Sequence, residues 1–136
     1  MKAADTSLVV AAFASWHQGH DGARRALDGG LCLIEHCALE TYSVLTRLPP
    51  PHRAAGEIVR DFLAARFPEP LLRLSASQYR EFVLSLPDRQ VTGGAAYDAL
   101  VAATAMANDV ELITCDRRAI PVYERYGIRS QLLVPR

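Results

Sequence analysis

Five short, mainly apolar runs, each bounded by turn residues or charges, constrain the fold of this 136-residue chain more than any other feature. A run that stays apolar, instead of alternating with polar residues, is typical of a strand buried on both faces of a sheet. Strands of this kind belong to mainly parallel sheets that carry helices on their faces. The runs expected to form strands are Lys2–Ala4, Leu31–Ile34, Leu71–Leu74, Glu111–Cys115 and Gln131–Val134.

Segments with the spacing of amphipathic helices lie between these runs. Apolar residues recur at intervals of three and four positions in 39–46, 55–63 and 97–104. Ser75 and Gln78 predict a capping box ahead of a helix over Tyr79–Leu86. Strands that alternate with helices predict an α/β layer fold, and the chain length is that of one domain over residues 1–136.

The charge balance excludes a strongly basic coat for nucleic acid. The chain has 15 Lys and Arg against 15 Asp and Glu, and its net charge is therefore zero. Lys2 is the only lysine, so nearly every cation is an arginine, the residue that binds phosphate through two parallel hydrogen bonds. Phosphate binding would therefore depend on local groups of arginines.

The start of the chain and its cysteines indicate a cytoplasmic protein. The apolar run Leu8–Ala14 is too short to span a bilayer. An acidic residue, Asp5, lies between Lys2 and this run, which is unlike a secretory signal. The three cysteines form no CxxC pair and match no common zinc spacing, so we expect inert thiols in a reducing compartment.

Four carboxylates fall at positions where an α/β protein builds its working site. Asp5 and Asp116 each come directly after a predicted strand. Asp98 lies in the first turn of a helix expected over Ala95–Asn108, and Glu40 lies near the start of the helix that follows the second strand. In open parallel sheets, ligands bind off the carboxyl ends of the strands. We therefore expect the four acidic side chains to meet there.

Each carboxylate also has a purely structural interpretation, which the sequence leaves open. Asp5 can cap a helix, Asp98 can be favoured by the helix dipole, Asp116 can cap the next helix, and Glu40 can pair with Arg47. Their convergence, however, would be costly. Two carboxylates about 5 Å apart repel each other by roughly 3 kcal/mol at an effective dielectric near 20. Either the carboxylates do not converge, or one or more stays protonated, or a cation neutralises them. A hard divalent cation such as Mg²⁺ or Mn²⁺ suits a set of oxygen ligands.

Three stretches of the sequence resemble those of a known family. They are "ADTSLVVAAF" with Asp5, "LETYSVLTRLP" with Glu40, and "GGAAYDALVAATAMANDVELITCD" with Asp98 and Asp116. In this order and at these separations they resemble the PIN-domain nucleases and, more narrowly, the toxin component of VapBC-type bacterial toxin–antitoxin pairs. The resemblance runs from residue 2 to about residue 120.

The resemblance implies a three-layer α/β/α sandwich and a metal-dependent endoribonuclease that inhibits translation and growth. Carried over by position, Asp5 and Asp98 would bind the principal Mg²⁺, with Mn²⁺ as the alternative ion. Glu40 and Asp116 would complete the catalytic cluster, and cleavage would leave a 5′-phosphate and a 3′-hydroxyl. The hydroxyl groups expected to orient these carboxylates are those of Thr6, Ser7 and Thr114.

Further expectations concern RNA and protein partners. Arg117 and Arg118 are candidates for phosphate contacts, as is the pair Arg24–Arg25, and the aromatic candidates for base stacking are Trp16 and Phe13. The four histidines are expected to be surface or structural residues. The resemblance also implies a cognate antitoxin protein and a homodimer.

Two other functions remain open at this stage. A phospho-accepting receiver domain also uses strand-end aspartates, but it needs an acidic pair at the first strand and a late lysine; here Ala4 precedes Asp5, and no lysine follows Lys2. A catalytically silent scaffold would keep the fold and use the stripe from Ala55 to Leu63 to bind a partner helix. Cleavage of RNA that requires Mg²⁺ separates an enzyme from a scaffold.

Overall fold

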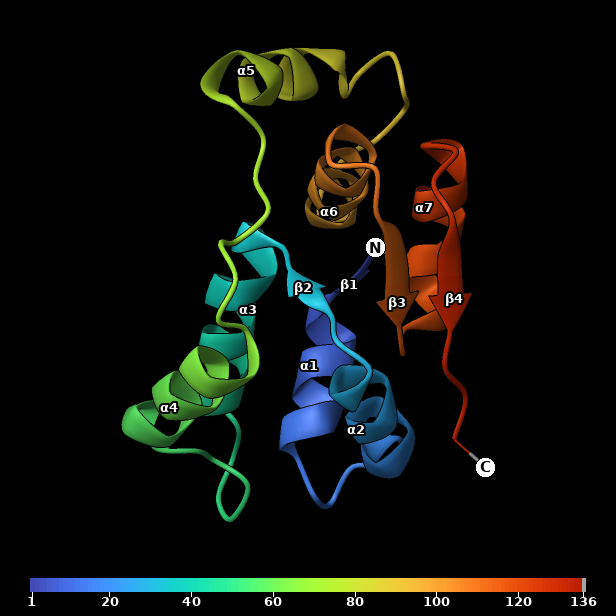
Figure 1. Ribbon diagram of the computed structural model, residues 1–136. Coiled ribbons are helices and arrows are strands. Elements are labelled where there is room, and N and C mark those ends of the chain that lie inside the picture. The colour runs from blue at the N-terminus through green and yellow to red at the C-terminus, as the bar shows by residue number, and fades with distance from the viewer. Residues whose placement is uncertain (136) are drawn as a thin grey trace.

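The computed structural model describes residues 1–135, which form one parallel sheet with helices around it (Figure 1). The sheet has the order β2-β1-β3-β4, and every neighbouring pair of strands is parallel. Its strands are β1 (Lys2–Ala4), β2 (Cys32–Leu33), β3 (Glu111–Thr114) and β4 (Ser130–Leu132). The predicted α/β class with a mainly parallel sheet is confirmed.

The prediction of a strand at Leu71–Leu74 is wrong. This segment forms a single bridge between Leu72 and Ile34. The Leu72 N–H donates to Leu33 O at 2.9 Å, and Leu72 O accepts from the Glu35 N–H at 2.8 Å. Two prolines precede the segment in "FPEP", and Ser75 caps the next helix directly after it. The chain therefore passes the sheet edge with room for one pairing only.

Seven α-helices and one 3₁₀ helix accompany the strands within residues 1–135. The helices that precede β3 are α1 (Thr6–Phe13), α2 (His20–Asp28), α3 (Glu35–Thr46), α4 (Gly56–Arg66), α5 (Ala76–Ser85) and α6 (Ala95–Ala107). The 3₁₀ helix η1 (Arg117–Ala119) and the helix α7 (Ile120–Arg125) lie between β3 and β4.

Helix α5 begins with the predicted capping box. Ser75 Oγ accepts from the Gln78 N–H at 3.1 Å, and Gln78 Oε1 accepts from the Ser75 N–H at 2.8 Å. Because this box satisfies two of the free N–H groups at the helix start, the helix begins at Ala76, earlier than the predicted Tyr79.

Helices cover both faces of the sheet, as a three-layer sandwich requires. Helices α1 and α2 pack together on one face, and α6 and α7 pack against β3 and β4 on the other, with α3 and α4 beside α1 (Figure 1). Helix α6 is rich in alanine, and Ala99, Ala102 and Ala105 are fully buried. Small side chains let this helix lie close to the sheet, which brings its first turn near the strand ends.

The stripe on α4 belongs mostly to the core. Val59 is fully buried, and Phe62 and Leu63 pack partly buried against the core, whereas Ile58 is 58% exposed. Most side chains of the stripe therefore pack against the core of this chain.

The order of the strands creates a switch point between β1 and β3. From β1 the chain crosses to β2 on one side, and it later returns to pair β3 with β1 on the other side. Helices that leave β1 and β3 depart in different directions, which opens a crevice at the carboxyl ends of these two strands. Asp5 follows β1, and Asp116 lies two residues after the end of β3.

Candidate active site

Asp5 is both the cap of helix α1 and a buried carboxylate at the switch point. It is only 4% exposed, and its Oδ1 accepts from the Leu8 N–H at 3.2 Å and from Ser7 Oγ at 2.6 Å. Its Oδ2 accepts from the Tyr123 hydroxyl at 2.8 Å. The capping interpretation and the strand-end interpretation of Asp5 therefore describe the same side chain.

A chain of hydroxyl groups links the ends of β1 and β3. Ser7 gives its single hydrogen to Asp5, so in the 3.1 Å contact between Ser7 Oγ and Thr114 Oγ1 the threonine is the donor. Ser7 Oγ also accepts from the Cys115 N–H at 2.8 Å, and Thr114 Oγ1 accepts from the Asp116 N–H at 3.0 Å. These bonds fix the relative positions of the backbones that carry Asp5 and Asp116.

All four acidic residues singled out in the sequence line one small cavity of about 50 Å³. Asp98 reaches it from the first turn of α6, and Glu40 reaches it from α3. The remaining residues that line the cavity are Thr6, Ser7, Val101 and Tyr123. Residues more than 100 positions apart in the sequence thus share one space.

The crowding of carboxylates changes their proton affinities. Burial, together with the negative charges of Asp116, Asp5 and Glu40 in that order, raises the pKa of Asp98 to about 6. Burial also raises the pKa of Asp5, against the opposing effect of its hydrogen bonds to Ser7 and Tyr123. Without a cation, the full ionisation of all four carboxylates in this cavity is therefore unfavourable.

Glu40 has a partner that the sequence did not indicate. Its Oε2 lies 3.4 Å from His36 Nε2, and the nearby His36 ring is the main cause that lowers the pKa of Glu40. The proposed pairing of Glu40 with Arg47 is replaced by a different contact, because Arg47 Nη1 donates to Ser43 Oγ at 2.7 Å. The spacing of His36 and Glu40, one helical turn apart, is the signal that could have suggested this contact.

Tyr123 is the second residue that sequence reasoning missed. It is 1% exposed, it comes from α7, and its hydroxyl donates to Asp5. Burial raises the pKa of this phenol, and the charge of Asp5 raises it further, so the hydroxyl remains a donor. No local spacing connects Tyr123 to Asp5, and only the tertiary fold brings them together.

Asp116 also caps the 3₁₀ helix and meets an arginine. Its Oδ1 accepts from the Arg118 N–H at 2.9 Å and lies 3.6 Å from Arg118 Nε. The Arg118 side chain is 94% exposed, and it lines a groove of about 390 Å³ that shares Glu40 and Asp116 with the acidic cavity. Arg117 is exposed beside it.

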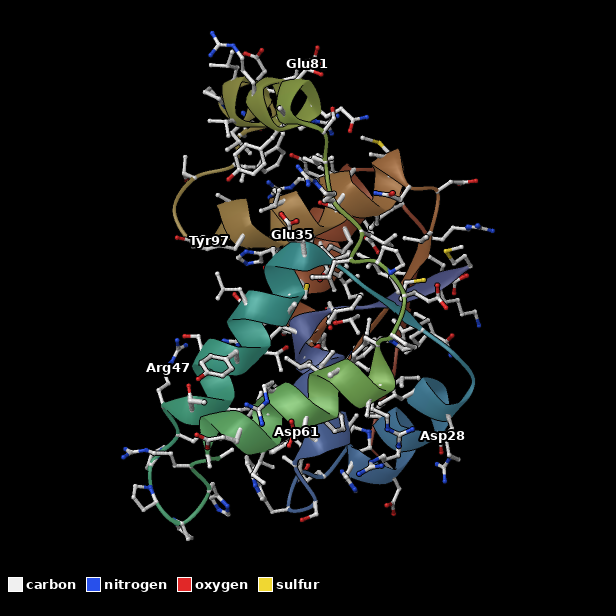
Figure 2. All side chains as sticks on the ribbon, turned by 60° about the vertical axis from the view of Figure 1, so that its left-hand side comes forward. Asp28, Glu35, Arg47, Asp61, Glu81 and Tyr97 are labelled. Atoms are coloured by element: carbon white, nitrogen blue, oxygen red, sulfur yellow. The ribbon has the colours of Figure 1, made fainter. Side chains whose placement is uncertain are left out.

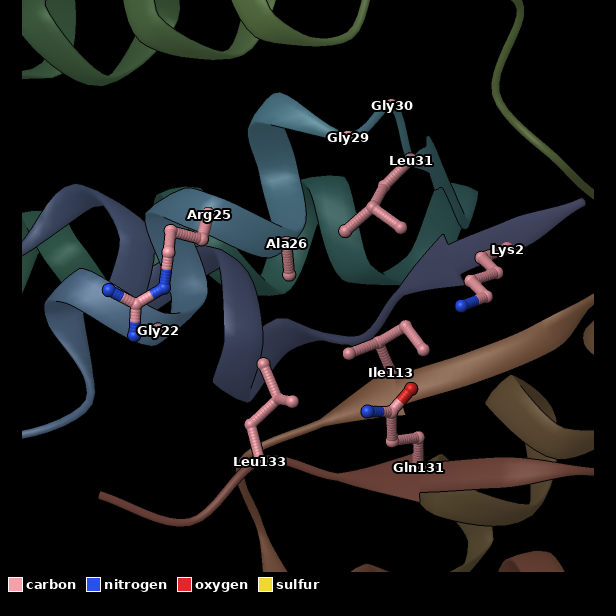
Figure 3. A pocket seen from close by; sticks show the side chains of 10 residues that line it. All are labelled: Lys2, Gly22, Arg25, Ala26, Gly29, Gly30, Leu31, Ile113, Gln131 and Leu133. Atoms are coloured by element: carbon pink, nitrogen blue, oxygen red, sulfur yellow. The ribbon is translucent and has the colours of Figure 1, made fainter. Parts of the chain in front are cut away.

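The other arginine pair lies elsewhere. Arg24 Nε donates to Ala12 O at 2.9 Å, so this side chain is used to hold α1 against α2, contrary to the expected phosphate contact. Arg25 and Lys2 lie around a separate hollow of about 370 Å³ between α2 and the sheet (Figure 3). That hollow shares no lining residue with the acidic cavity.

The two aromatic candidates for base stacking differ in exposure. Phe13 packs edge-on against Phe62, with ring centroids 5.3 Å apart, and so has a core role. Trp16 is 49% exposed and lies 4.2 Å from the ring of His52.

Comparison with known proteins assigns the family. The model of the PIN domain matches residues 3–125, most of the chain and every residue of the acidic cavity. The chain belongs to the PIN-domain family. Within that family it is 51% identical to Ribonuclease VapC40 of Mycobacterium tuberculosis over 98% of this chain and 99% of that protein. It is also 40% identical to Ribonuclease VapC27 of the same organism, over 93% of this chain and 92% of that protein.

A solved structure supports the fold. The PIN domain aligns with a chain in the crystal structure of FitAcB from Neisseria gonorrhoeae, with a TM-score of 0.68, 15% identity and 96% coverage of both chains. At this identity the match shows the fold alone. It agrees with the three-layer sandwich that the resemblance implied.

The PIN family implies a divalent metal, and the donor set of the cavity is suited to one. Within residues 1–135, no lysine or arginine lines the cavity, so no side-chain cation neutralises it from inside. No three His, Cys, Asp or Glu side chains in that range are grouped closely enough to enclose an ion by themselves. Mg²⁺ usually takes one or two carboxylates and completes its shell with waters and phosphate oxygens. The arrangement therefore fits a hydrated, oxygen-liganded cation and not a fully caged one.

The Thr6 hydroxyl lies at the cavity wall, near Glu40. Its Oγ1 is buried and has no well-aligned hydrogen-bond partner among the described residues. It is nevertheless one of the causes that lower the pKa of Glu40. The expected role of Thr6 in orienting a carboxylate therefore stays a prediction.

The three cysteines have the properties of inert thiols. All three cysteines are free thiols, and burial raises the pKa of Cys37 to about 12 and that of Cys115 to about 11, which disfavours the reactive thiolate. Across residues 1–135, each helix is too short or too polar to traverse a bilayer.

Proposed function

We propose that this PIN domain is a divalent-metal-dependent endoribonuclease that acts as the toxin of a toxin–antitoxin pair and restrains translation and growth by cutting cytoplasmic RNA. Two relatives that align over nearly the whole chain carry the name ribonuclease. The observation that carries the proposal is that Asp5, Glu40, Asp98 and Asp116 line one cavity at the switch point of the sheet. Carboxylates crowded in this way are suited to bind a cation and are poorly suited to a site without one.

In this proposal Asp5 and Asp98 hold Mg²⁺, with Mn²⁺ as the alternative. When bound, the ion polarises a phosphoryl oxygen and lowers the pKa of a coordinated water. Ser7 and Tyr123 fix the orientation of Asp5 through opposite oxygens of its carboxylate. Glu40 and Asp116 accept hydrogen bonds from water on the other walls of the cavity.

The arginines next to the cavity supply the phosphate contacts. Arg118 is exposed, and within residues 1–135 its only ion-pair partner is Asp116, whose Oδ1 lies 3.6 Å from Arg118 Nε. Exposed ion pairs of this kind are weak, so exchanging the carboxylate for a phosphate group costs little. Arg118 therefore binds an RNA phosphate at the mouth of the groove, and Arg117 contributes beside it.

The decisive experiment is cleavage of single-stranded RNA by the purified protein with Mg²⁺, with Mn²⁺ and with EDTA. We expect cleavage with either metal, none with EDTA, and products with a 5′-phosphate and a 3′-hydroxyl. The Asp98→Asn variant should fold and should neither cleave RNA nor arrest growth. Cleavage by that variant at the wild-type rate, or cleavage by the wild type in EDTA, would reject the assignment.

A silent scaffold is the alternative, and the same assay separates it from the enzyme. A scaffold would bind its partner and arrest no growth, whether or not Mg²⁺ is present. Mapping the RNA 5′ ends after brief induction identifies the RNA that is cut and excludes a contaminating nuclease when Asp98→Asn serves as the control.

We also propose that a cognate antitoxin and a second copy of this chain cover exposed apolar side chains of α3 and α4. Leu39 is 71% exposed and Ile58 is 58% exposed, and the helices that carry them, α3 and α4, pack against each other, which supports the proposal. Co-expression with the antitoxin should restore growth, and light scattering should give the mass of a dimer. Leu39→Ser and Ile58→Ser should weaken one of these associations without changing the circular dichroism spectrum.

A further inference from the structure

An exposed aromatic stack lies beside the acidic cavity and has no role in the function proposed above. The Tyr97 ring is nearly parallel to that of His36, with centroids 5.5 Å apart and planes 7° apart. Tyr97 directly precedes Asp98 at the start of α6, and His36 lies 3.4 Å from Glu40. Tyr97 is thus joined to Asp98 through the backbone, and His36 contacts Glu40 through its side chain.

The exposure of Tyr97 is not explained by packing. Tyr97 is 59% exposed, although the later turns of the same helix, from Val101 to Ala105, are buried. Figure 2 shows Tyr97 at the end of α6 that lies beside the start of α3, near the labelled Glu35. His36 covers one face of the phenol ring, and its side chain is only 21% exposed. The Tyr97 ring therefore stacks on His36 with one face and leaves most of its surface open to solvent.

The charge of the molecule indicates what such a face would bind. Phosphate contacts usually dominate the affinity of proteins for nucleic acids, but this chain has no net charge and its cavity is lined by four carboxylates. Arg118 and Arg117 supply few phosphate contacts. RNA held near this cavity needs a source of affinity that does not depend on positive charge, and stacking of bases on aromatic rings is such a source.

We propose that the open face of Tyr97 is a stacking platform for one unpaired base of the RNA, next to the phosphate that is cut. The inference rests on the proposed ribonuclease function and assigns a binding residue to the same site. A base can reach Tyr97 only when it is free of its own helical stack, so the platform selects single-stranded RNA or a loop. Since every base has an aromatic face, it discriminates weakly between the four bases.

Steady-state kinetics on a single-stranded RNA test the platform. Tyr97→Ala should raise KM about 5- to 150-fold, the range given by loss of one base–aromatic stack, and should change kcat little. Tyr97→Phe keeps the ring and should restore the wild-type KM. Met106→Ala is the matched control, because Met106 is an apolar residue 50% exposed at the far end of the same helix.

A fluorescence experiment tests contact with the base directly. Trp16 is the only tryptophan, so the double variant Trp16→Phe, Tyr97→Trp places a single fluorophore on the platform. Single-stranded RNA should quench its emission in EDTA, where no cleavage occurs, and a fully paired RNA of the same length should quench it much less. The Trp16→Phe variant provides the background.

Several outcomes would overturn the inference. A fall in kcat at constant KM would mean that Tyr97 only positions Glu40 through His36. A change of oligomeric mass in Tyr97→Ala would mean that the ring contacts protein. Equal quenching by paired and unpaired RNA would exclude base stacking. If the wild type cleaves RNA and Tyr97→Ala has an unchanged KM, this inference alone fails; if the wild type neither binds nor cleaves RNA, the proposed function fails.

Discussion

The hydroxyl of Tyr123 donates a 2.8 Å hydrogen bond to Oδ2 of Asp5 across 118 positions of sequence. It complements the bonds from Ser7 Oγ and the Leu8 N–H to Oδ1, so both oxygens of this buried carboxylate are held. A carboxylate fixed at both oxygens is preorganised for a cation, because little motion remains to be lost on binding.

Removal of this hydroxyl should weaken both folding and activity. Tyr123→Phe leaves a buried Asp5 oxygen without its donor, which should lower the free energy of unfolding by about 1–3 kcal/mol. Urea denaturation measures this change, and RNA cleavage should slow in parallel. Tyr126→Phe is the matched control, since the buried Tyr126 hydroxyl has no partner in the described residues and its loss should be neutral or stabilising. Equal effects of the two substitutions would contradict the role given to Tyr123.

Ser7→Ala should have a similar effect from the other side of Asp5. The substitution removes the donor to Oδ1 and leaves the Cys115 N–H without its acceptor. We expect a loss of about 1–3 kcal/mol in the free energy of unfolding and slower cleavage of RNA. Ser77→Ala, at an exposed position of α5, should change neither quantity.

Asp98 should make the metal-free protein less stable as the pH rises from about 4 to about 6. Its pKa is raised from 3.8 to about 6 in the folded protein, so in this interval the folded state binds more protons than the unfolded state, and stability falls as the pH increases. Urea midpoints in EDTA across this range measure the slope. Asp98→Asn should reduce the slope and be more stable than the wild type at pH 7. An identical slope in both proteins would show that burial and the neighbouring carboxylates do not raise the pKa of Asp98.

Divalent cations should offset the loss of stability that ionised Asp98 causes in the metal-free protein. Mg²⁺ at about a hundred times its dissociation constant should stabilise the wild type by about 2.7 kcal/mol, measured as a rise in Tm. Asp98→Asn should show a much smaller rise. NaCl at matched ionic strength controls for screening, and an equal rise with NaCl would mean that no specific cation site exists.

The sequence predicts the features that follow from local patterns of apolar residues and from general rules for parallel sheets. The runs at Lys2–Ala4 and Glu111–Cys115 predicted strands, and strand ends in a parallel sheet share an edge, so Asp5 and Asp116 were expected together before the structure placed them around one cavity. The resemblance predicted the family and the three-layer fold. Both are confirmed.

The features that the sequence did not predict depend on tertiary contacts. Tyr123 contacts Asp5 because α7 packs against α6 and β4, and no sequence periodicity encodes that contact. The apolar content of Leu71–Leu74 predicts a strand but does not reveal how many residues pair, and only the bridge at Leu72 forms. Arg24 looked available for phosphate, but the backbone oxygen of Ala12 engages it.

The parallel pairing of β1 with β3 also determines when the acidic cavity can form during synthesis. Asp5 is translated before Glu111–Thr114, the strand that pairs with β1, and before Tyr123, the residue that donates to its second carboxylate oxygen. A nascent chain that stops before these residues carries the first carboxylate without the walls around it. The acidic cavity is therefore complete only after Tyr123 has been translated.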